Sequence, residues 1–206
     1  MIEYVIAQNP DTRILQKASN ALKEGQLVCL PTDTNWVLVC DPFHKIGVEK
    51  LYQMRKADAE KHFSLLCDAV SRASHLARIS TEVFRLIKNK IPGHYTFIFE
   101  AEKTITKHLK ASKKDHEIGI RFPPNRLVQE LIRVHDNALL SSNVTLEMLG
   151  ISDDSIEIYG YLIEESIGHQ LAMILDPSDY EFAGPSTIVS FINGEPEVLR
   201  EGAGEF

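Results

Sequence analysis

Short apolar runs alternate with amphipathic segments along this chain. Apolar runs of about four to eight residues are typical of buried strands, whereas apolar positions three or four residues apart are typical of helices. The runs predict strands at residues 2–6, 27–30, 35–40, 63–67, 95–99, 118–122, 138–142, 171–175, 186–192 and 197–200. The spacing predicts helices at residues 10–24, 44–56, 71–77, 81–90, 103–111, 123–135 and 152–168. This alternation favours an α/β domain with helices packed on a sheet.

Turn residues sharpen some of these boundaries. Asn9-Pro10 predicts a cap and a first-turn proline for the first helix. Asn193-Gly194 predicts a tight type I′ hairpin between the last two strands, and Pro196 marks an edge position. The chain has no internal repeat and no linker-like tract. We therefore expect a single domain over residues 1–206, with a mixed sheet.

Composition narrows the class of protein. The chain has 206 residues, of which 44% are hydrophobic and 25% charged, as in an ordinary globular protein. No apolar run approaches the roughly 20 residues that a membrane span requires, and the N-terminal residues do not resemble a signal peptide. Three cysteines without paired spacing predict reduced thiols and a cytoplasmic protein.

The net charge of −7 is unevenly distributed along the chain. Residues 1–146 contain 21 Lys and Arg against 16 Asp and Glu, a net +5, whereas residues 147–206 contain Arg200 against 13 acids, a net −12. A basic body with an acidic end favours an anionic ligand held by the body. A surface on which the charges mix in space explains the same numbers.

Residues 27–40 carry the most informative local pattern. Two apolar runs flank the polar break Pro31-Thr32-Asp33-Thr34, in which Pro31 ends the first strand. The break places two hydroxyls and one carboxylate at a strand end, where a ligand would meet oriented donors and acceptors. An ordinary turn, with these side chains bonded to their own backbone, is the alternative.

Several common sites are absent from the sequence. There is no P-loop, no G-x-G-x-x-G, no G-x-S-x-G and no zinc-ligand spacing among the eight histidines. We expect no metal site built by the protein and interpret His94 as a strand-entry residue. A bound nucleotide would then be held by scattered cations and hydroxyls at element ends. Such groups are Arg55, Lys61, Thr96, Arg121, Ser141, Asn143, Ser186 and Arg200.

The order of these motifs resembles the YrdC/YciO family. The matching stretches are Pro31–Thr34, the basic loop with Lys61, Pro92–Phe97, Ile120–Pro123, Leu140–Ser142, Ser186–Val189 and Val198–Gly202. The resemblance implies a twisted, open α/β sheet with flanking helices and a basic concave face. It implies synthesis of threonylcarbamoyl-AMP from L-threonine, bicarbonate and ATP, toward the threonylcarbamoyladenosine of tRNA. It also implies binding of double-stranded RNA.

The resemblance further implies residue roles. Thr32, Thr34, Ser141 and Ser186 would contact the substrate, and Arg121 would bind the carboxylate of threonine. Arg55 and Lys61 would be catalytic. Arg55, Lys61, Thr96, Asn143 and Arg200 would bind the nucleotide, and Mg²⁺ would accompany ATP.

Two departures from the family pattern favour its YciO branch. The synthases carry Lys-x-Arg where this chain has Arg55-Lys56-Ala57, and Ser-x-Asn where it has Asn143-Val144-Thr145. One hypothesis is therefore a synthase weakened by these changes. The other is a nucleotide-binding or RNA-binding protein without the reaction, and a purely structural module is disfavoured.

Five lysines support the RNA hypothesis from the sequence. They are Lys103, Lys107, Lys110, Lys113 and Lys114. Such a cluster is typical of a surface that follows phosphates, or else of a solvated helix face.

Overall fold

A computed structural model of the chain describes residues 1–55, 63–109 and 116–206. Its strands are β1 (Ile2–Tyr4), β2 (Val28–Pro31), β3 (Trp36–Cys40), β4 (Ser64–Leu66), β5 (Tyr95–Glu100), β6 (Glu117–Arg121), β7 (Leu139–Asn143), β8 (Met173–Asp176), β9 (Thr187–Ser190) and β10 (Glu197–Arg200). Its helices are α1 (Thr12–Lys23), α2 (Lys45–Met54), α3 (Val70–Ala73), α4 (Thr81–Ile87), α5 (Lys103–Thr106), α6 (Arg126–His135) and α7 (Gly160–Ile167), followed by the 3-10 turn η1 (Gly168–Gln170).

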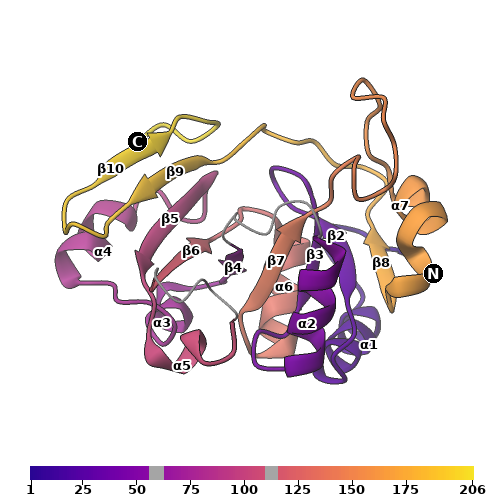
Figure 1. Ribbon diagram of the computed structural model, residues 1–206, viewed down its shortest axis with the longest axis horizontal. Helices are drawn as coiled ribbons and strands as arrows, with labels where there is room; N and C mark the ends of the chain where they lie inside the picture. The colour runs from indigo at the N-terminus through magenta and orange to yellow at the C-terminus, as the bar shows by residue number, and fades with distance from the viewer. Residues whose placement is uncertain (56–62, 110–115) are drawn as a thin grey trace.

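The strands form one open sheet in the order β1-β8-β2-β3-β7-β4-β6-β5-β9-β10. Both directions occur, because β2 pairs in parallel with β8 and antiparallel with β3. The last two strands along the chain, β9 and β10, lie at one end of the sheet, and β1 lies at the other (Figure 1). The expected single-domain α/β fold with a mixed sheet and flanking helices is confirmed.

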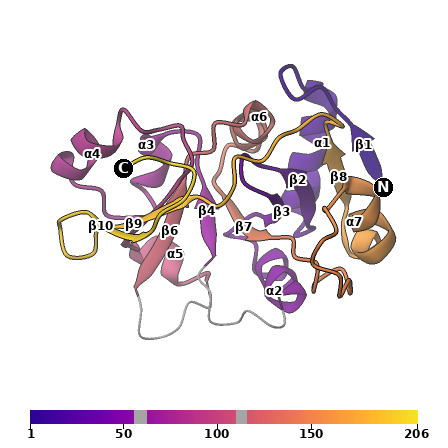
Figure 2. The ribbon, with the colours of Figure 1, turned by 90° about the horizontal axis from the view of Figure 1, so that it is seen from above.

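Both faces of β2 and β3 are buried. Successive strand residues point to opposite sides of a sheet, and here the residues on each side pack in a core cluster of their own. Val28, Leu30, Val37 and Val39 pack with apolar residues of α1 and α6, whereas alternate residues of the same strands belong to the other core cluster. Figure 2 shows α1 and α6 on one side of these strands and α2 on the other. The continuous apolar runs of the sequence reflect this double burial.

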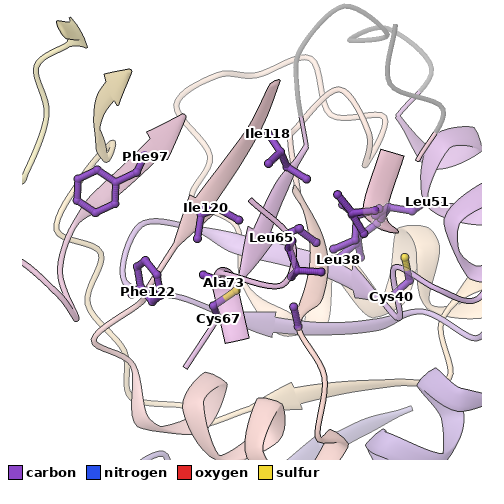
Figure 3. Close-up of a cluster of buried hydrophobic side chains, with 14 of the residues drawn as sticks. Leu38, Cys40, Leu51, Leu65, Cys67, Ala73, Phe97, Ile118, Ile120 and Phe122 are labelled. Carbon is purple, nitrogen blue, oxygen red and sulfur yellow. The ribbon is translucent and has the colours of Figure 1, made fainter. Parts of the chain in front are cut away.

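The larger core cluster joins the two halves of the sheet. Leu38 and Cys40 of β3 lie in it with Leu65, Cys67 and Phe97 of β5 (Figure 3). All three cysteines are buried free thiols. Burial raises the pKa of each, for Cys67 to about 12, so the thiolate forms sparingly at neutral pH.

Several predicted helix boundaries are wrong. The helices α3, α4 and α5 end at Ala73, Ile87 and Thr106, before the predicted ends at residues 77, 90 and 111. The first helix is capped by Asp11, whose carboxylate accepts a hydrogen bond from the backbone of Arg13, so Asn9-Pro10 lies before it. The last predicted helix begins at Gly160 rather than at residue 152. There, Asp153 Oδ1 accepts hydrogen bonds from both the backbone N–H and the hydroxyl of Ser155. This local side-chain bonding competes with the helix.

The predicted two-residue hairpin is also wrong. Strands β9 and β10 do pair antiparallel, but Glu197 lies opposite Ser190, so residues 191–196 form the loop. Phe191 leaves the hairpin because its N–H bonds to Ile98 and its ring stacks with Phe99 at 5.6 Å. Burial of this ring therefore decides the loop length. The edge position expected near Pro196 agrees with β10 being the terminal strand.

Candidate functional site

A cavity of about 1050 Å³ lies over the middle of the sheet. Its floor follows from strand register, because Ser141, Ser64, Gly119 and Ile98 lie opposite one another across β7, β4, β6 and β5. The end of α2, residues 145–150 and the linker from β8 to β9 supply its walls. This linker, residues 177–186, runs along one edge of the sheet to reach β9 (Figure 1).

Gly119 keeps this floor open. A Cβ atom at this position would lie 3.1 Å from Ser64 Oγ and 3.2 Å from Thr96 Cγ2. Both distances are shorter than ordinary van der Waals contact, so a side chain would push against the hydroxyl of Ser64 and the methyl group of Thr96.

The structure brings most of the predicted site residues to this one cavity. Those that line it are Thr34, Arg55, Thr96, Arg121, Ser141, Asn143, Ser186 and Arg200. Lys61 lies outside the described residues. Glu117 and Glu147 also line the cavity, so its described wall combines three arginines with two carboxylates.

Thr32 is not among the cavity-lining residues. Its side chain is buried, and its hydroxyl donates to the carbonyl oxygen of Asn35 at 2.9 Å and accepts from the backbone N–H of Thr34 at 3.2 Å. The turn alternative therefore describes Thr32, while Thr34 faces the cavity.

Asp33 lies behind the cavity and binds Arg121. Arg121 Nη2 donates to Asp33 Oδ1 at 2.8 Å, and the two side chains are only 6% and 5% exposed. The Nε atom of Arg121 is buried and has no hydrogen-bond partner within the described residues. The guanidinium is thus held in place by one carboxylate and is left with unused hydrogen-bonding capacity.

The electrostatics of Arg121 point to an anionic ligand. Burial lowers the pKa of its guanidinium, the Asp33 carboxylate opposes this effect, and the positive charge of Arg200 adds to it. An arginine nevertheless stays protonated in a protein. A lowered pKa therefore means that a buried positive charge is incompletely compensated, and an anion in the cavity would complete the compensation.

Arg200 is held by the end of the linker. Its Nη2 donates to the carbonyl oxygen of Ser186 at 2.6 Å, and its Nε donates to the same oxygen at 3.2 Å. The hydroxyl of Ser186 lies 2.8 Å from that of Thr96. Three predicted site residues, from β5, the linker and β10, therefore form one hydrogen-bonded group.

The chain after β10 fastens the same linker. Ala203 donates its N–H to the carbonyl oxygen of Pro185 at 2.8 Å. A Cβ atom on Gly202 would fall within 2.2 Å of that oxygen, so only glycine allows this approach. The site wall at residues 184–186 is thus fixed from both sides.

The end of β7 places the altered Ser-x-Asn segment at the cavity. Ser141 donates its hydroxyl to the carbonyl oxygen of Ser64 at 2.8 Å. Val144 is buried, whereas Asn143 and Thr145 on either side of it line the cavity. The hydroxyl of Thr145 accepts the backbone N–H of Met148 at 3.2 Å, so it organises the turn that follows.

Arg55 follows the last residue of α2, and its guanidinium lies 4.4 Å from the ring centroid of Phe63. This cation–π contact fixes the side chain at the cavity wall. Ala57, the second altered motif position, lies outside the described residues.

His94 and the two glutamates are the site features that sequence reasoning missed. His94 Nδ1 lies 2.8 Å from Asp33 Oδ2, across 61 residues of chain. The sequence places only one partner of this contact, Asp33, among polar groups at a strand end. Nothing in the sequence pairs Asp33 with His94.

A second polar cluster, outside the cavity, has the residue types of a hydrolase triad. His135 Nδ1 lies 3.2 Å from Ser19 Oγ, and its Nε2 lies 3.4 Å from Asp41 Oδ2. Ser19 and His135 are almost fully buried, and none of the three residues lines the cavity. The bond between Ser19 and His135 joins α1 to α6, so we interpret this cluster as structural.

Two absences in the described part of the chain bear on function. Within the described residues, no group of three or more His, Cys, Asp or Glu is arranged to hold a metal ion. Within the same residues, no helix combines the length and the apolarity needed to cross a membrane.

Comparison with curated proteins finds relatives along nearly the whole chain. An uncharacterized protein of Haemophilus influenzae is 31% identical over 98% of this chain and 95% of its own length. The uncharacterized protein YciO of Escherichia coli is 28% identical with the same coverage. A threonylcarbamoyl-AMP synthase of Vibrio vulnificus is 25% identical over 84% of this chain and 91% of its own length.

Comparison with solved structures finds the same family of proteins. The crystal structure of E. coli YciO matches with a TM-score of 0.85, covering 100% of this chain and 98% of that one. P. abyssi Sua5 complexed with L-threonine matches with a TM-score of 0.78 at 20% identity. This chain spans 58% of the Sua5 chain. At 20% identity, this match shows the shared fold alone.

A family model described as "Telomere recombination" matches residues 20–202, which include every cavity-lining residue named above. The chain therefore belongs to the Sua5/YciO/YrdC family.

Proposed function

We propose that the cavity binds L-threonine and ATP and forms threonylcarbamoyl-AMP from threonine, bicarbonate and ATP. The observation that carries this proposal is the buried, incompletely compensated Arg121 facing the cavity near a second cation, Arg200. A volume of about 1050 Å³ accommodates an amino acid beside a nucleotide. The synthase among the relatives and the threonine complex of Sua5 support the choice of substrates.

Arg121 binds the carboxylate of threonine, because a rigid planar guanidinium suits a carboxylate. Thr34 and Ser141 line the same cavity and provide hydroxyls. Thr32 acts indirectly by shaping the turn that presents Thr34.

The triphosphate of ATP lies against the cations and hydroxyls of Arg55, Thr96, Ser186 and Arg200, with Asn143 and Lys61 as further contacts. The apolar side chains of Ile98, Ile118 and Ile188 line the same cavity and suit the adenine ring. Mg²⁺ arrives with ATP, since this ion is usually held by phosphates, water and one or two carboxylates. Glu117 and Glu147 are the carboxylates at the cavity that fit this role.

The reaction requires positioning and charge neutralisation rather than a protein nucleophile. The amine of threonine attacks bicarbonate, and a carbamate forms with loss of water. A carbamate oxygen then attacks the α-phosphorus, and the bond to the leaving pyrophosphate breaks. Arg55 and Lys61 neutralise the charge that develops on the phosphates, and Arg121 holds the threonine in place.

We place this activity in the cytoplasm, as a step toward a threonylcarbamoyl-modified adenosine in tRNA. The three buried free thiols suit a reducing compartment.

Pyrophosphate release that depends on both threonine and bicarbonate tests the proposal. Arg121→Gln removes the positive charge at the cavity, and we expect it to abolish threonine binding in calorimetry. Arg133→Gln is the matched control, because Arg133 is an exposed residue of α6 that pairs with Glu130. Threonine binding by folded Arg121→Gln equal to that of the parent would refute the assignment.

Nucleotide or RNA binding without the reaction is the second candidate. Lys103 and Lys107 are exposed on and beside α5, as a phosphate-binding surface requires. The other three lysines of the predicted cluster fall outside the described residues. Intact ATP binding without threonine-dependent release of pyrophosphate would favour this candidate.

A further inference from the structure

The carboxylate of Asp33 joins two side chains from different parts of the fold. One oxygen accepts Arg121 Nη2 from β6 at 2.8 Å. The other lies 2.8 Å from His94 Nδ1, in the loop before β5. Because an ionised carboxylate only accepts, Nδ1 carries the proton and donates it to Asp33. A continuous contact thus links the cavity arginine to a histidine that is 35% exposed.

We infer that His94 is a positioning residue for Arg121 and that its charge sets the affinity of the cavity for carboxylates. The inference rests on the proposed function in one respect, the assignment of Arg121 as the carboxylate-binding group.

The charges of the three groups explain the expected effect. With a neutral imidazole, the charges of Asp33 and Arg121 sum to zero. The negative charge of Asp33 then offsets much of the positive potential that the guanidinium produces in the cavity. With an imidazolium, the three groups sum to +1, and Asp33 is shared between two cations. More of the charge of Arg121 is then available to an anion in the cavity. Carboxylate affinity should therefore be higher when the imidazole of His94 is protonated than when it is neutral.

Backbone contacts hold this linkage in place. Ala183 in the linker donates its N–H to the carbonyl oxygen of Asp33 at 2.8 Å, and Thr187 donates to that of His94 at 3.0 Å. The charged groups around the linkage come from three elements, namely Asp33 from the turn after β2, Arg121 from β6 and, beyond it, Arg200 from β10. The two arginines remain charged throughout this range of pH.

Calorimetry with L-threonine and with acetate, at about pH 6 and about pH 8, tests the inference in the range where histidine titrates. We expect the wild type to bind both probes several-fold more tightly at the lower pH. His94→Gln keeps a donor toward Asp33 but does not titrate, so its affinity should be independent of pH. His94→Ala loses the donor, and its affinity should fall about threefold or more at both pH values.

His75→Gln is the matched control, because His75 is an exposed histidine next to α3 that is not among the cavity-lining residues. It should keep the wild-type dependence on pH. A His94→Gln variant that also keeps this dependence overturns the inference. Loss of binding in Arg121→Gln, combined with such a result, would leave the proposed function standing.

A measurement without ligand decides the matter if neither probe binds, which would refute the proposed function. In nitrogen NMR of the full chain, the Arg121 Nε–H signal should shift with the same midpoint as the imidazole of His94. In Asp33→Asn, the Arg121 Nε–H signal should no longer follow the protonation of His94. An Arg121 signal that does not follow His94 in the wild type overturns the inference.

Discussion

Arg200 and Ser186 are joined by three hydrogen bonds, two from the guanidinium to the carbonyl oxygen and one, at 3.3 Å, from Nη2 to the hydroxyl. The bonds to the carbonyl oxygen, from Nη2 and Nε, measure 2.6 Å and 3.2 Å. They attach β10 to the end of the linker at the cavity wall. Arg200 therefore provides both a positive charge for a ligand and a brace for the residues that contact it.

These two roles can be separated by substitution. Arg200→Lys keeps the charge but loses the forked contact with Ser186, whereas Arg200→Gln loses both. Because a charge-assisted hydrogen bond contributes about 1.5–3 kcal/mol, we expect Arg200→Gln to weaken ATP binding about tenfold or more. Arg200→Lys should fall between this variant and the wild type. Calorimetry with ATP provides the measurement.

Arg126 offers matched controls for the two Arg200 variants. Its side chain is 56% exposed, and its ion pair with Glu130 is long, at 3.9 Å. Arg126→Lys and Arg126→Gln should bind ATP as the wild type does. Equal ATP affinity in all four variants would show that Arg200 does not contact the nucleotide.

Restoring the family side chains should raise synthase activity. Asn143 and Thr145 both line the cavity, so Asn143→Ser and Thr145→Asn act where the substrates are proposed to bind. The side-chain oxygen that Thr145→Asn introduces is also an acceptor, so it can replace the hydroxyl that now accepts the N–H of Met148. Each restored hydrogen bond contributes roughly 1 kcal/mol.

Ala57→Arg should give the larger gain, since one preorganised donor at a developing charge is typically worth about 10²–10³ in rate. The triple variant should exceed it. Threonine-dependent pyrophosphate release by the parent, single and triple variants measures the gains. Equal inactivity of all three, with folding and ATP binding intact, would mean that the missing side chains are not the cause.

The buried Ser19–His135–Asp41 cluster should contribute to stability and not to activity. Ser19→Ala leaves His135 Nδ1 without its contact, and an unsatisfied buried polar group costs about 1–3 kcal/mol. Urea denaturation should show this loss in the free energy of unfolding. Threonine and ATP affinities should stay unchanged, and a variant as stable as the wild type would contradict the assignment.

Asp41 should make that contribution dependent on pH. Burial would raise the pKa of its carboxyl, but His135 and the backbone N–H of Phe43 more than offset this and hold the pKa below its usual value of 3.8. A depressed pKa means that the stabilisation is complete above the unfolded value and is lost as pH falls through the folded value. Asp41→Asn should therefore destabilise the protein at neutral pH, and the difference from the wild type should shrink below about pH 4. A difference that stays constant down to that range would contradict the sign.

The RNA hypothesis can be tested with the two described lysines. The double variant Lys103→Glu/Lys107→Glu should weaken binding of double-stranded RNA and reduce the salt dependence of affinity by about two units of slope. Lys23→Glu/Lys45→Glu changes the net charge equally at exposed positions of α1 and α2. Equal effects of the two double variants would indicate a general effect of charge, and no RNA binding by the wild type would exclude the hypothesis.

The sequence alone determined the elements that depend on local pattern. Double burial of β2 and β3 leaves continuous apolar runs, and α6 shows its buried stripe directly. The order of seven short motifs along the chain led to the family. Two of the boundaries that failed, at Asp153 and at Phe191, failed where a side-chain bond or the burial of one ring overrode the local pattern.

Only the tertiary structure decided which of the polar residues share a cavity and which side chains they contact there. The cavity floor depends on register across four strands, and the turn that holds Thr32 keeps it away from the cavity. Asp33 contacts both Arg121, which is 88 positions away along the chain, and His94, which is 61 positions away. No local propensity encodes such pairs, because their energy comes from burial and charge that exist only once the sheet has formed.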